Sequence, residues 1–209
     1  VMSDGVQNIP PGAFNGCTWL QSVTLPSGLS RIKPNTFRNC SSLASIILPD
    51  SLICIEPNVF WGCSAWSNIV FPTGLDTIRD NAFHGCTSLT GITLPDSLRY
   101  IGANAFEDCS ALTSFTVPPA VRHIGSEALK NCPSLKDLYY NAISVHQWDT
   151  IWHHCAVGLD EWGNSIYDTC IDYIGYRNGG VSVDMLAGTT LVERMVVGEG
   201  VNDMTAIWQ

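Results

Sequence analysis

Hydrophobic and polar positions recur along residues 1–155 with a period of 23 residues. In each period two apolar residues flank a third position, as Val23 and Leu25 flank Thr24, and a proline follows at Pro26. Alternation at period two is typical of a short strand with one buried face. Proline ends the strand because it has no N–H to donate to a ladder. The pattern therefore predicts one short strand in every 23 residues.

The second half of each unit contains the signals for bends and turns. A Leu-x-x-Ile step, such as Leu29 and Ile32, suits a second short extended segment or a tight bend. An Asn-x-Phe sequence and a Gly-Cys or Asn-Cys pair then follow. We expect this segment to form a helical turn that ends in an Asx or glycine bend.

A single unit cannot bury its own apolar face, so the units must stack. Stacking at the strand spacing of about 4.8 Å makes a continuous parallel sheet and a continuous core. The repeat therefore predicts a solenoid, a curved right-handed coil with a parallel β-sheet on its concave face. Short strands, turns and helical turns would complete each coil.

The register of the repeat divides this single domain into three parts. Residues 1–155 carry the repeats, and the first unit is truncated because Val6, Ile9 and Phe14 occupy only its later positions. Residues 156–188 lose the register, so we expect an irregular insertion or cap there. Residues 189–209 are similar to a further, degenerate repeat of the same domain.

These units resemble a known family. Residues 83–98, FHGCTSLTGITLPDSL, look like the BspA-like leucine-rich repeat, also called the Treponema pallidum type. The resemblance covers about residues 1–155 well and residues 189–208 weakly. It implies a leucine-rich-repeat solenoid that is secreted or displayed on the surface of a host-associated bacterium or a protist parasite. Several members of this family serve as adhesins, and the family shares no catalytic motif.

Seven cysteines occupy one position of the repeat. They are Cys17, Cys40, Cys63, Cys86, Cys109, Cys132 and Cys155. A cysteine that recurs once per unit is a repeat position rather than a pairing scheme, and it suits a small buried thiol. Side chains that point the same way rarely reach the dihedral angle of a disulfide. We therefore predict a structural cysteine ladder without metal or redox chemistry.

Composition and charge exclude several classes of partner. The formal net charge is −9, whereas nucleic-acid binding needs a positive surface that releases counterions. No apolar run is long enough to cross a bilayer, so we expect no membrane insertion.

Motifs for catalysis and for metal binding are also missing from the sequence. It contains no G-x-S-x-G, no glycine-rich phosphate loop, no G-x-G-x-x-G after a strand and no H-E-x-x-H. We therefore expect no enzyme and no cofactor. His153, His154 and Cys155, with His146 nearby, are weak zinc candidates because adjacent residues seldom point at one metal ion. We expect no metal site among them.

The outward positions of the strands are the candidate binding surface. These residues are Thr24, Ile47, Asn68, Val70, Thr93, Ser114, Thr116 and Tyr139. They are small, mostly polar and nearly uncharged. A recognition surface for an extended ligand and a solvated row of β-forming residues are two interpretations that the sequence leaves open.

A binding module for a protein on a host or neighbouring cell is the function we expect, with the repeat sheet as the contact surface. A rigid spacer or stalk for another domain is the first alternative. Carbohydrate binding through C-terminal aromatic residues is the second, although these residues equally suit a cap over the last coil. They are Tyr139, Tyr140, Trp148, Trp152, Trp162, Tyr167, Tyr173 and Tyr176.

A stripe of basic residues lies beside the Leu-x-x-Ile step. It comprises Arg31, Lys33, Arg79, Arg99, Arg122 and His123. A sulfated glycan is one possible ligand for such a stripe. Acidic residues such as Asp76 and Asp80 interrupt it, and basic tracts that bind polyanions are denser. A solvated row of mixed charge is the favoured interpretation.

Overall fold

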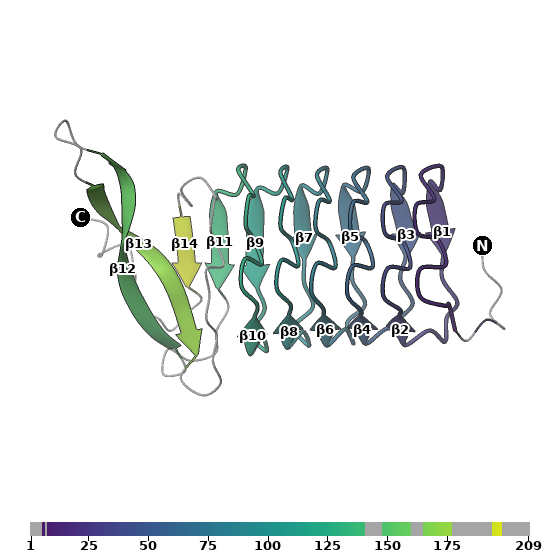
Figure 1. The fold of residues 1–209 in the computed structure, drawn as a ribbon. Coiled ribbons are helices and arrows are strands. Elements are labelled where there is room, and N and C mark those ends of the chain that lie inside the picture. The colour runs from purple at the N-terminus through teal and green to yellow at the C-terminus, as the bar shows by residue number, and fades with distance from the viewer. Residues whose placement is uncertain (1–5, 7, 141–147, 160–164, 177–193, 198–209) are drawn as a thin grey trace.

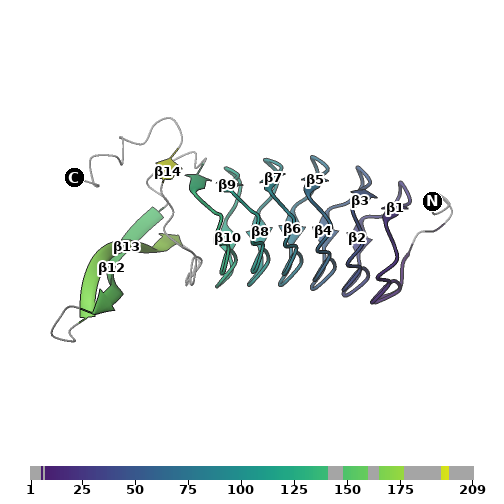
Figure 2. The same cartoon turned by 90° about the horizontal axis from the view of Figure 1, so that it is seen from above.

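Residues 6, 8–140, 148–159, 165–176 and 194–197 are described by the computed structural model. The repeats form a row of stacked coils, and each coil contributes strands to two separate parallel sheets (Figure 1). The view from above shows the two sheets along the same row of coils (Figure 2). The predicted solenoid with a parallel sheet is therefore confirmed.

The main sheet consists of the strands that the alternating pattern predicts. They are β1 (Ser22–Thr24), β3 (Ser45–Ile47), β5 (Asn68–Val70), β7 (Gly91–Thr93), β9 (Ser114–Val117) and β11 (Asp137–Tyr140). Neighbouring strands pair in parallel one full repeat apart, as Ser22 does with Ser45. Residues 23 positions apart in the sequence therefore lie side by side in the sheet.

The second sheet is built from the Leu-x-x-Ile step, which is extended rather than only bent. Its strands are β2 (Arg31–Ile32), β4 (Cys54–Ile55), β6 (Thr77–Ile78), β8 (Tyr100–Ile101) and β10 (His123–Ile124). The isoleucine of each strand is buried. One side of the coil is thereby closed by a row of two-residue strands.

The predicted helical turns are instead successive hydrogen-bonded turns, and no helix occurs within the described part of the chain. The reason is the backbone of the Asn and Gly positions. In one such turn Asn35 has a φ of 60° and Asn39 a φ of 59°. Left-handed residues this close together interrupt a right-handed helix, and Asn and Gly adopt that conformation most easily.

The turns join neighbouring coils through a third row of backbone hydrogen bonds. The amide of Phe37 donates to the carbonyl of Val59 at 3.0 Å, and the amide of Gly85 donates to the carbonyl of Glu107 at 2.8 Å. Each donor bonds the coil that follows it. Hydrogen bonds along all the sides of the coil therefore fix how adjacent turns face each other.

A stack of phenylalanine rings runs through the core behind these turns. Phe37, Phe60, Phe83 and Phe106 are fully buried. The ring centroids of Phe60 and Phe83 are 5.3 Å apart, and those of Phe83 and Phe106 are 5.2 Å apart. These are favourable distances for stacked aromatic side chains. One aromatic residue per coil therefore gives a continuous core.

The main sheet is interrupted between β3 and β5, which belong to separate hydrogen-bonded groups of strands. The coil that contains β5 has Trp66 where most other coils have leucine. Trp66 is 1% exposed, and its ring meets Phe60 edge-on at 4.9 Å. The interruption of the ladder thus coincides with the one coil of this sheet in which an indole replaces leucine at the buried position.

Two further groups of strands follow the coils. β12 (Trp148–Leu159) pairs antiparallel with β13 (Ser165–Tyr176), and β14 (Arg194–Val197) pairs in parallel with β11. Much of the segment predicted as an insertion or cap, residues 156–188, is thus in a strand pair. Its residues 160–164 and 177–188 lie outside the described residues, as do 189–193 and 198–209 of the predicted degenerate repeat.

No helix among the described residues has the length and hydrophobicity that a membrane crossing requires.

Candidate binding surfaces

The outward side of the main sheet presents the side chains that the alternating pattern selects. Val23, Ile69 and Ile92 point into the core and are at most 9% exposed, whereas Ile47 and Val70 are 65% and 81% exposed. The remaining candidates of this face with described side chains are also partly or fully exposed. They are Thr24, Asn68, Thr93, Ser114 and Thr116.

Ile47 and Val70 form an apolar patch on this face, called here the Ile47–Val70 patch. Both residues occupy the same outward position in consecutive coils, at the ends of β3 and β5. Thr24 lies beside Ile47 and Thr93 beside Val70 in the paired strands. The patch therefore lies where the ladder between β3 and β5 is interrupted, and threonines flank it. Tyr139 is in β11, and its side chain is outside the described part of the structure.

The cysteine ladder is buried and reduced from Cys40 to Cys132, and Cys17 is partly exposed. Each buried thiol donates to the carbonyl of a phenylalanine in the preceding coil, as Cys86 does to Phe60 at 3.3 Å. Burial raises the pKa of the Cys40 thiol to about 11 and that of the Cys132 thiol to about 12. These thiols stay protonated near neutral pH and are poor nucleophiles and metal ligands.

Cys155 lies in β12 rather than in a turn of the coil. His153 and His154 precede it in the same strand, and His146 is outside the described residues. His153 pairs with Cys170 and His154 with Thr169. The side chains of His153, His154 and Cys155 lie outside the described part of the structure.

Acidic and aromatic side chains contact several residues of the basic stripe beside the second sheet. Arg31 pairs with Glu56 at 2.7 Å, and Arg99 lies 3.6 Å from Asp76. His123 stacks on Tyr100 at 4.4 Å. Alternating charges of this kind favour a solvated row over a polyanion site.

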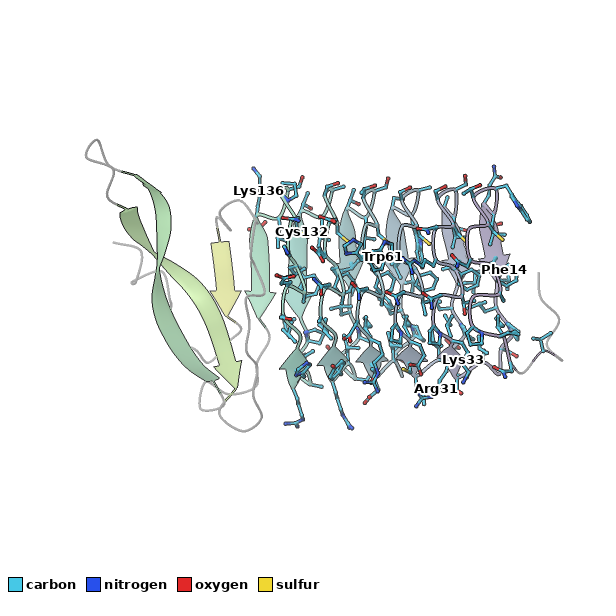
Figure 3. All side chains as sticks on the ribbon, in the orientation of Figure 1. Phe14, Arg31, Lys33, Trp61, Cys132 and Lys136 are labelled. Atoms are coloured by element: carbon cyan, nitrogen blue, oxygen red, sulfur yellow. The ribbon has the colours of Figure 1, made fainter. Side chains whose placement is uncertain are left out.

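A row of side chains on the turns was not selected by the sequence analysis. It follows the buried phenylalanines one residue later, and Trp61 is labelled in Figure 3. The guanidinium of Arg38 lies 4.6 Å from the Trp61 ring, and that ring is 4.2 Å from His84. His84 in turn contacts Glu107, whose carboxylate is 3.6 Å from the Lys130 ammonium. The sequence could have revealed this row, because its residues are spaced 23 positions apart like the rest of the repeat.

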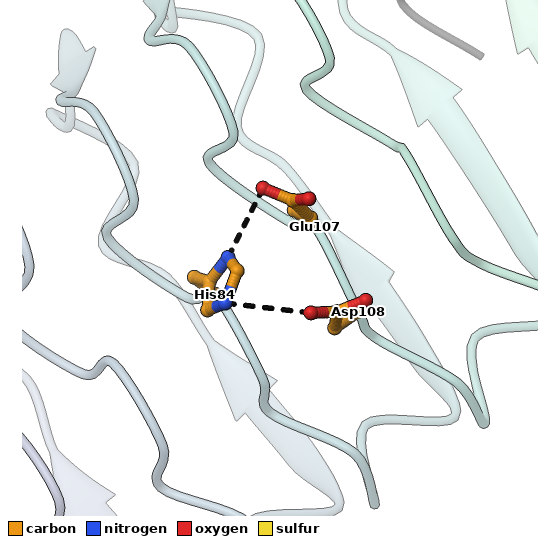
Figure 4. Close-up of side chains that lie close together, drawn as sticks. All are labelled: His84, Glu107 and Asp108. Carbon is orange, nitrogen blue, oxygen red and sulfur yellow. Dashed lines mark ion pairs between the residues drawn. The ribbon is translucent and has the colours of Figure 1, made fainter. Parts of the chain in front are cut away.

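One histidine of this row lies between two carboxylates (Figure 4). His84 Nδ1 is 3.3 Å from Glu107 Oε2, and His84 Nε2 is 3.4 Å from Asp108 Oδ2. One nitrogen or oxygen of each residue lies within 4.8 Å of the others, which is close enough for the three to share a cation. The turns thus bring together a set of polar groups that the sequence analysis did not combine.

Comparison with known proteins assigns the repeats. The model of the BspA type leucine-rich repeat region matches six copies over residues 1–93. The sequence matches no curated protein. Among solved structures, the T. pallidum leucine-rich repeat protein is 34% identical, with a TM-score of 0.61. That similarity covers 66% of this chain and 68% of the T. pallidum protein.

A more distant structure shares the fold alone. The pneumococcal vaccine antigen PcpA is 23% identical with a TM-score of 0.52, over 60% of this chain and 31% of PcpA. The family model matches within the repeats, and the T. pallidum structure shares their fold. The chain belongs to the BspA-type leucine-rich-repeat family.

Proposed function

We propose that this chain is a secreted or cell-surface module that binds another protein through the outward face of its main sheet, without catalysis. The observation that carries the proposal is the exposure of Ile47 and Val70, at 65% and 81%. Family membership supports a role in protein interaction, because repeat proteins of this kind commonly present an extended surface to a partner.

The Ile47–Val70 patch can contribute binding energy because it is apolar and already exposed. Full burial of one such side chain contributes about 1.5–3 kcal/mol. The neighbouring threonines and Asn68 supply hydroxyl and amide groups that can bond a partner around the apolar centre. An apolar centre with a polar rim is the usual organisation of a protein interface.

The sheet is ordered before it meets a partner, which lowers the entropic cost of binding. Backbone hydrogen bonds join β5 to β7 and β9 to β11, and the turns are joined along the other side. Little backbone freedom remains to be lost on association. The same stiffness suits the alternative role of a spacer, which stays a prediction.

Membership of the family supports the proposed location outside the cell, and the coil itself adds nothing to it. A glycan remains a second class of partner in the proposal. The aromatic residues predicted to contact it include Trp148, Trp152 and Tyr173 in β12 and β13, whose side chains are not described, and Trp162, which lies outside the described residues.

Binding to a panel of extracellular matrix proteins and glycans tests the proposal. The native chain is compared with the double variant Ile47→Arg/Val70→Arg, which places two charges on the patch. Ile53→Arg is the matched control, because Ile53 is also an exposed apolar residue, at 44%, but precedes β4 in the second sheet. Circular dichroism checks that all three proteins keep the same fold.

Saturable binding to a protein that weakens at least roughly tenfold in the double variant, and not in Ile53→Arg, supports the proposal; tenfold corresponds to about 1.4 kcal/mol. Binding that both variants retain contradicts the assignment of the main-sheet face. Binding to glycans alone contradicts a protein partner.

A further inference from the structure

The turn row contains a cluster of three side chains that can ligate a metal ion. His84 comes from one coil, and Glu107 and Asp108 come from the turn of the next (Figure 4). Both imidazole nitrogens face a carboxylate, at 3.3 and 3.4 Å. The side chains of His84 and Glu107 are only 16% and 13% exposed, whereas Asp108 is 45% exposed. The cluster is therefore mostly shielded but open to solvent on one side.

One nitrogen of the His84 imidazole lacks a hydrogen-bond partner. Its Nδ1 is shielded from solvent and has no hydrogen-bond partner, although Glu107 Oε2 is close. Buried polar atoms are nearly always bonded, so an exception needs an explanation. The ring is held by its neighbour, since its centroid is 4.2 Å from that of Trp61. A nitrogen lone pair beside a carboxylate is the arrangement that a shared cation would satisfy.

We propose that His84, Glu107 and Asp108 bind a divalent first-row transition-metal ion such as Zn²⁺. Imidazole nitrogen and carboxylate oxygen bind Zn²⁺ at about 2.0–2.2 Å. Ligand atoms around a tetrahedral ion are then about 3.3–3.5 Å apart, by the geometry of those bond lengths. Either ring nitrogen lies at such a distance from one carboxylate, Nδ1 at 3.3 Å from Glu107 and Nε2 at 3.4 Å from Asp108. Only one nitrogen can bind the ion, so the second carboxylate, whose ligand atom lies within 4.8 Å of the other two, must move closer. One nitrogen of the ring ligates the ion, and water completes the coordination on the exposed side of Asp108.

The repeat itself does not require these three residues. Trp61 and Gly62 occupy the positions of His84 and Gly85 one coil earlier, and Asp108 stands where those coils have glycine. The backbone at Asp108 has the same left-handed conformation as the glycines, with a φ of 58°. The amide of Gly85 donates to the carbonyl of Glu107 at 2.8 Å, which fixes the two coils against each other at the cluster. The ligands are thus coil-specific side chains on an ordered backbone.

Lys130 is the cation that competes with a metal at this cluster. Its ammonium is 3.6 Å from Glu107 Oε1 and 3.1 Å from Glu127 Oε2. Glu107 Oε2 accepts a hydrogen bond from the Asn104 side-chain amide and also faces His84. The Asp108 carboxylate faces the other ring nitrogen of His84. An imidazolium protonated on both nitrogens is the competing explanation for the two close carboxylates. Metal binding distinguishes the two, because a ligating imidazole must be unprotonated.

Calorimetric titration of the whole chain with Zn²⁺ at pH 7.5 tests the site, with Co²⁺ as a spectroscopic probe of coordination. His84→Gln and Asp108→Asn remove ligands with little change of shape. His123→Gln is a matched control, because His123 contacts Tyr100 and is not in the cluster. His153→Gln/His154→Gln controls for the histidines of β12. Thermal unfolding without metal checks that each variant still folds.

The proposal expects one saturable Zn²⁺ site per chain that Ca²⁺ does not occupy at equal concentration, since Ca²⁺ prefers oxygen ligands alone. Affinity falls at least roughly 10- to 100-fold in His84→Gln and Asp108→Asn, as losses around metal sites do. Affinity is unchanged in both controls. No saturable binding, binding that survives His84→Gln, or binding lost only with His153 and His154 overturns the proposal.

Discussion

Two neighbouring rows of the coil differ in how much their residues vary. The buried row holds Phe37, Phe60, Phe83 and Phe106. The row one residue later lies on the turn surface and holds Arg38, Trp61, His84, Glu107 and Lys130. The inner row must fill the same space in every coil, so one residue type recurs. The outer row has no such constraint, so its residues are free to serve binding.

Adjacent residues of the main sheet show the same contrast between a buried and an outward position. Ile69 is 3% exposed and belongs to the core, whereas Val70 is 81% exposed. Threonine occupies this outward position in the strands that flank the patch. Side chains that depart from their repeat without a packing reason are therefore the first candidates for function.

Trp66 is buried like the residues of the inner row, yet it differs from the leucine that other coils have at this position. Trp66→Ala leaves a cavity beside Phe60 and Phe83, and we expect a loss of about 3–5 kcal/mol in the free energy of unfolding. Urea denaturation measures this loss. Trp66→Leu restores the usual residue and should cost less and slow amide exchange in β5. Equal losses in the two variants would contradict the role given to the indole.

The cysteine ladder predicts a pH dependence of stability. Burial raises the pKa values of the Cys86 and Cys109 thiols well above 9.0, their ordinary value. Above that pH the unfolded chain loses protons that the folded chain retains, so stability falls as the pH rises. We expect a slope of about 1.4 kcal/mol per pH unit for each thiol. Urea denaturation between pH 8 and 10.5 measures the slope.

Cys86→Ala/Cys109→Ala is the control for this dependence. Removal of two thiols should make the decrease in stability above pH 9 shallower, while stability at pH 7 changes for packing reasons alone. A decrease of unchanged slope would mean that other groups, such as lysines, cause the alkaline loss.

The left-handed turn positions predict a smaller effect that depends on residue type. Asn81 has a φ of 56°, and its amide donates to the carbonyl of Ala103 at 2.9 Å. Asn81→Ala should lower the free energy of unfolding by about 1–2 kcal/mol, the cost of a left-handed conformation. Asn81→Gly keeps the backbone unstrained and serves as the matched variant. Equal free energies of unfolding for the alanine and glycine variants would mean that the left-handed backbone does not determine which residue suits this position.

The Ile47–Val70 patch predicts the smallest effect on stability. Ile47→Thr and Val70→Thr introduce the residue of the flanking strands at positions that are already exposed. Each should change the free energy of unfolding by no more than about 0.5 kcal/mol. Chemical denaturation of both single variants measures this. A large loss would show that the pair packs against the fold and is not available to a partner.

Much of the fold could be predicted from the sequence because the repeat is a physical constraint. Positions such as Ile32 and Phe37 recur at 23 residues since every coil buries the same interior. The prediction of helical turns expected a bend only at the end of each turn, whereas Asn35 and Asn39 both have left-handed backbones within one turn. The strand pair β12–β13 was beyond prediction, because residues 156–188 carry no repeat from which to derive a register.

The candidate sites were predictable only in part. Alternation identified the outward face and included Ile47 and Val70, but it assigned them no priority over Thr24 and Thr93. Their exposed fractions supplied that distinction. The cluster at His84 was not predicted because the repeat reveals positions at which one residue type recurs, and this outer position holds a different residue in each coil.

Urea denaturation of Phe83→Ala beside His84→Ala tests most directly whether the inner row builds the coil while the outer row is free. The two residues are adjacent in sequence, but the Phe83 side chain is buried in the core, whereas the His84 side chain lies on the turn and is 16% exposed. Phe83→Ala should lose about 3–5 kcal/mol of unfolding free energy, as buried phenylalanines do. His84→Ala should stay within about 1 kcal/mol, the range of exposed and partly exposed contacts. Comparable losses in both variants would contradict the division of the coil into a structural and a functional row.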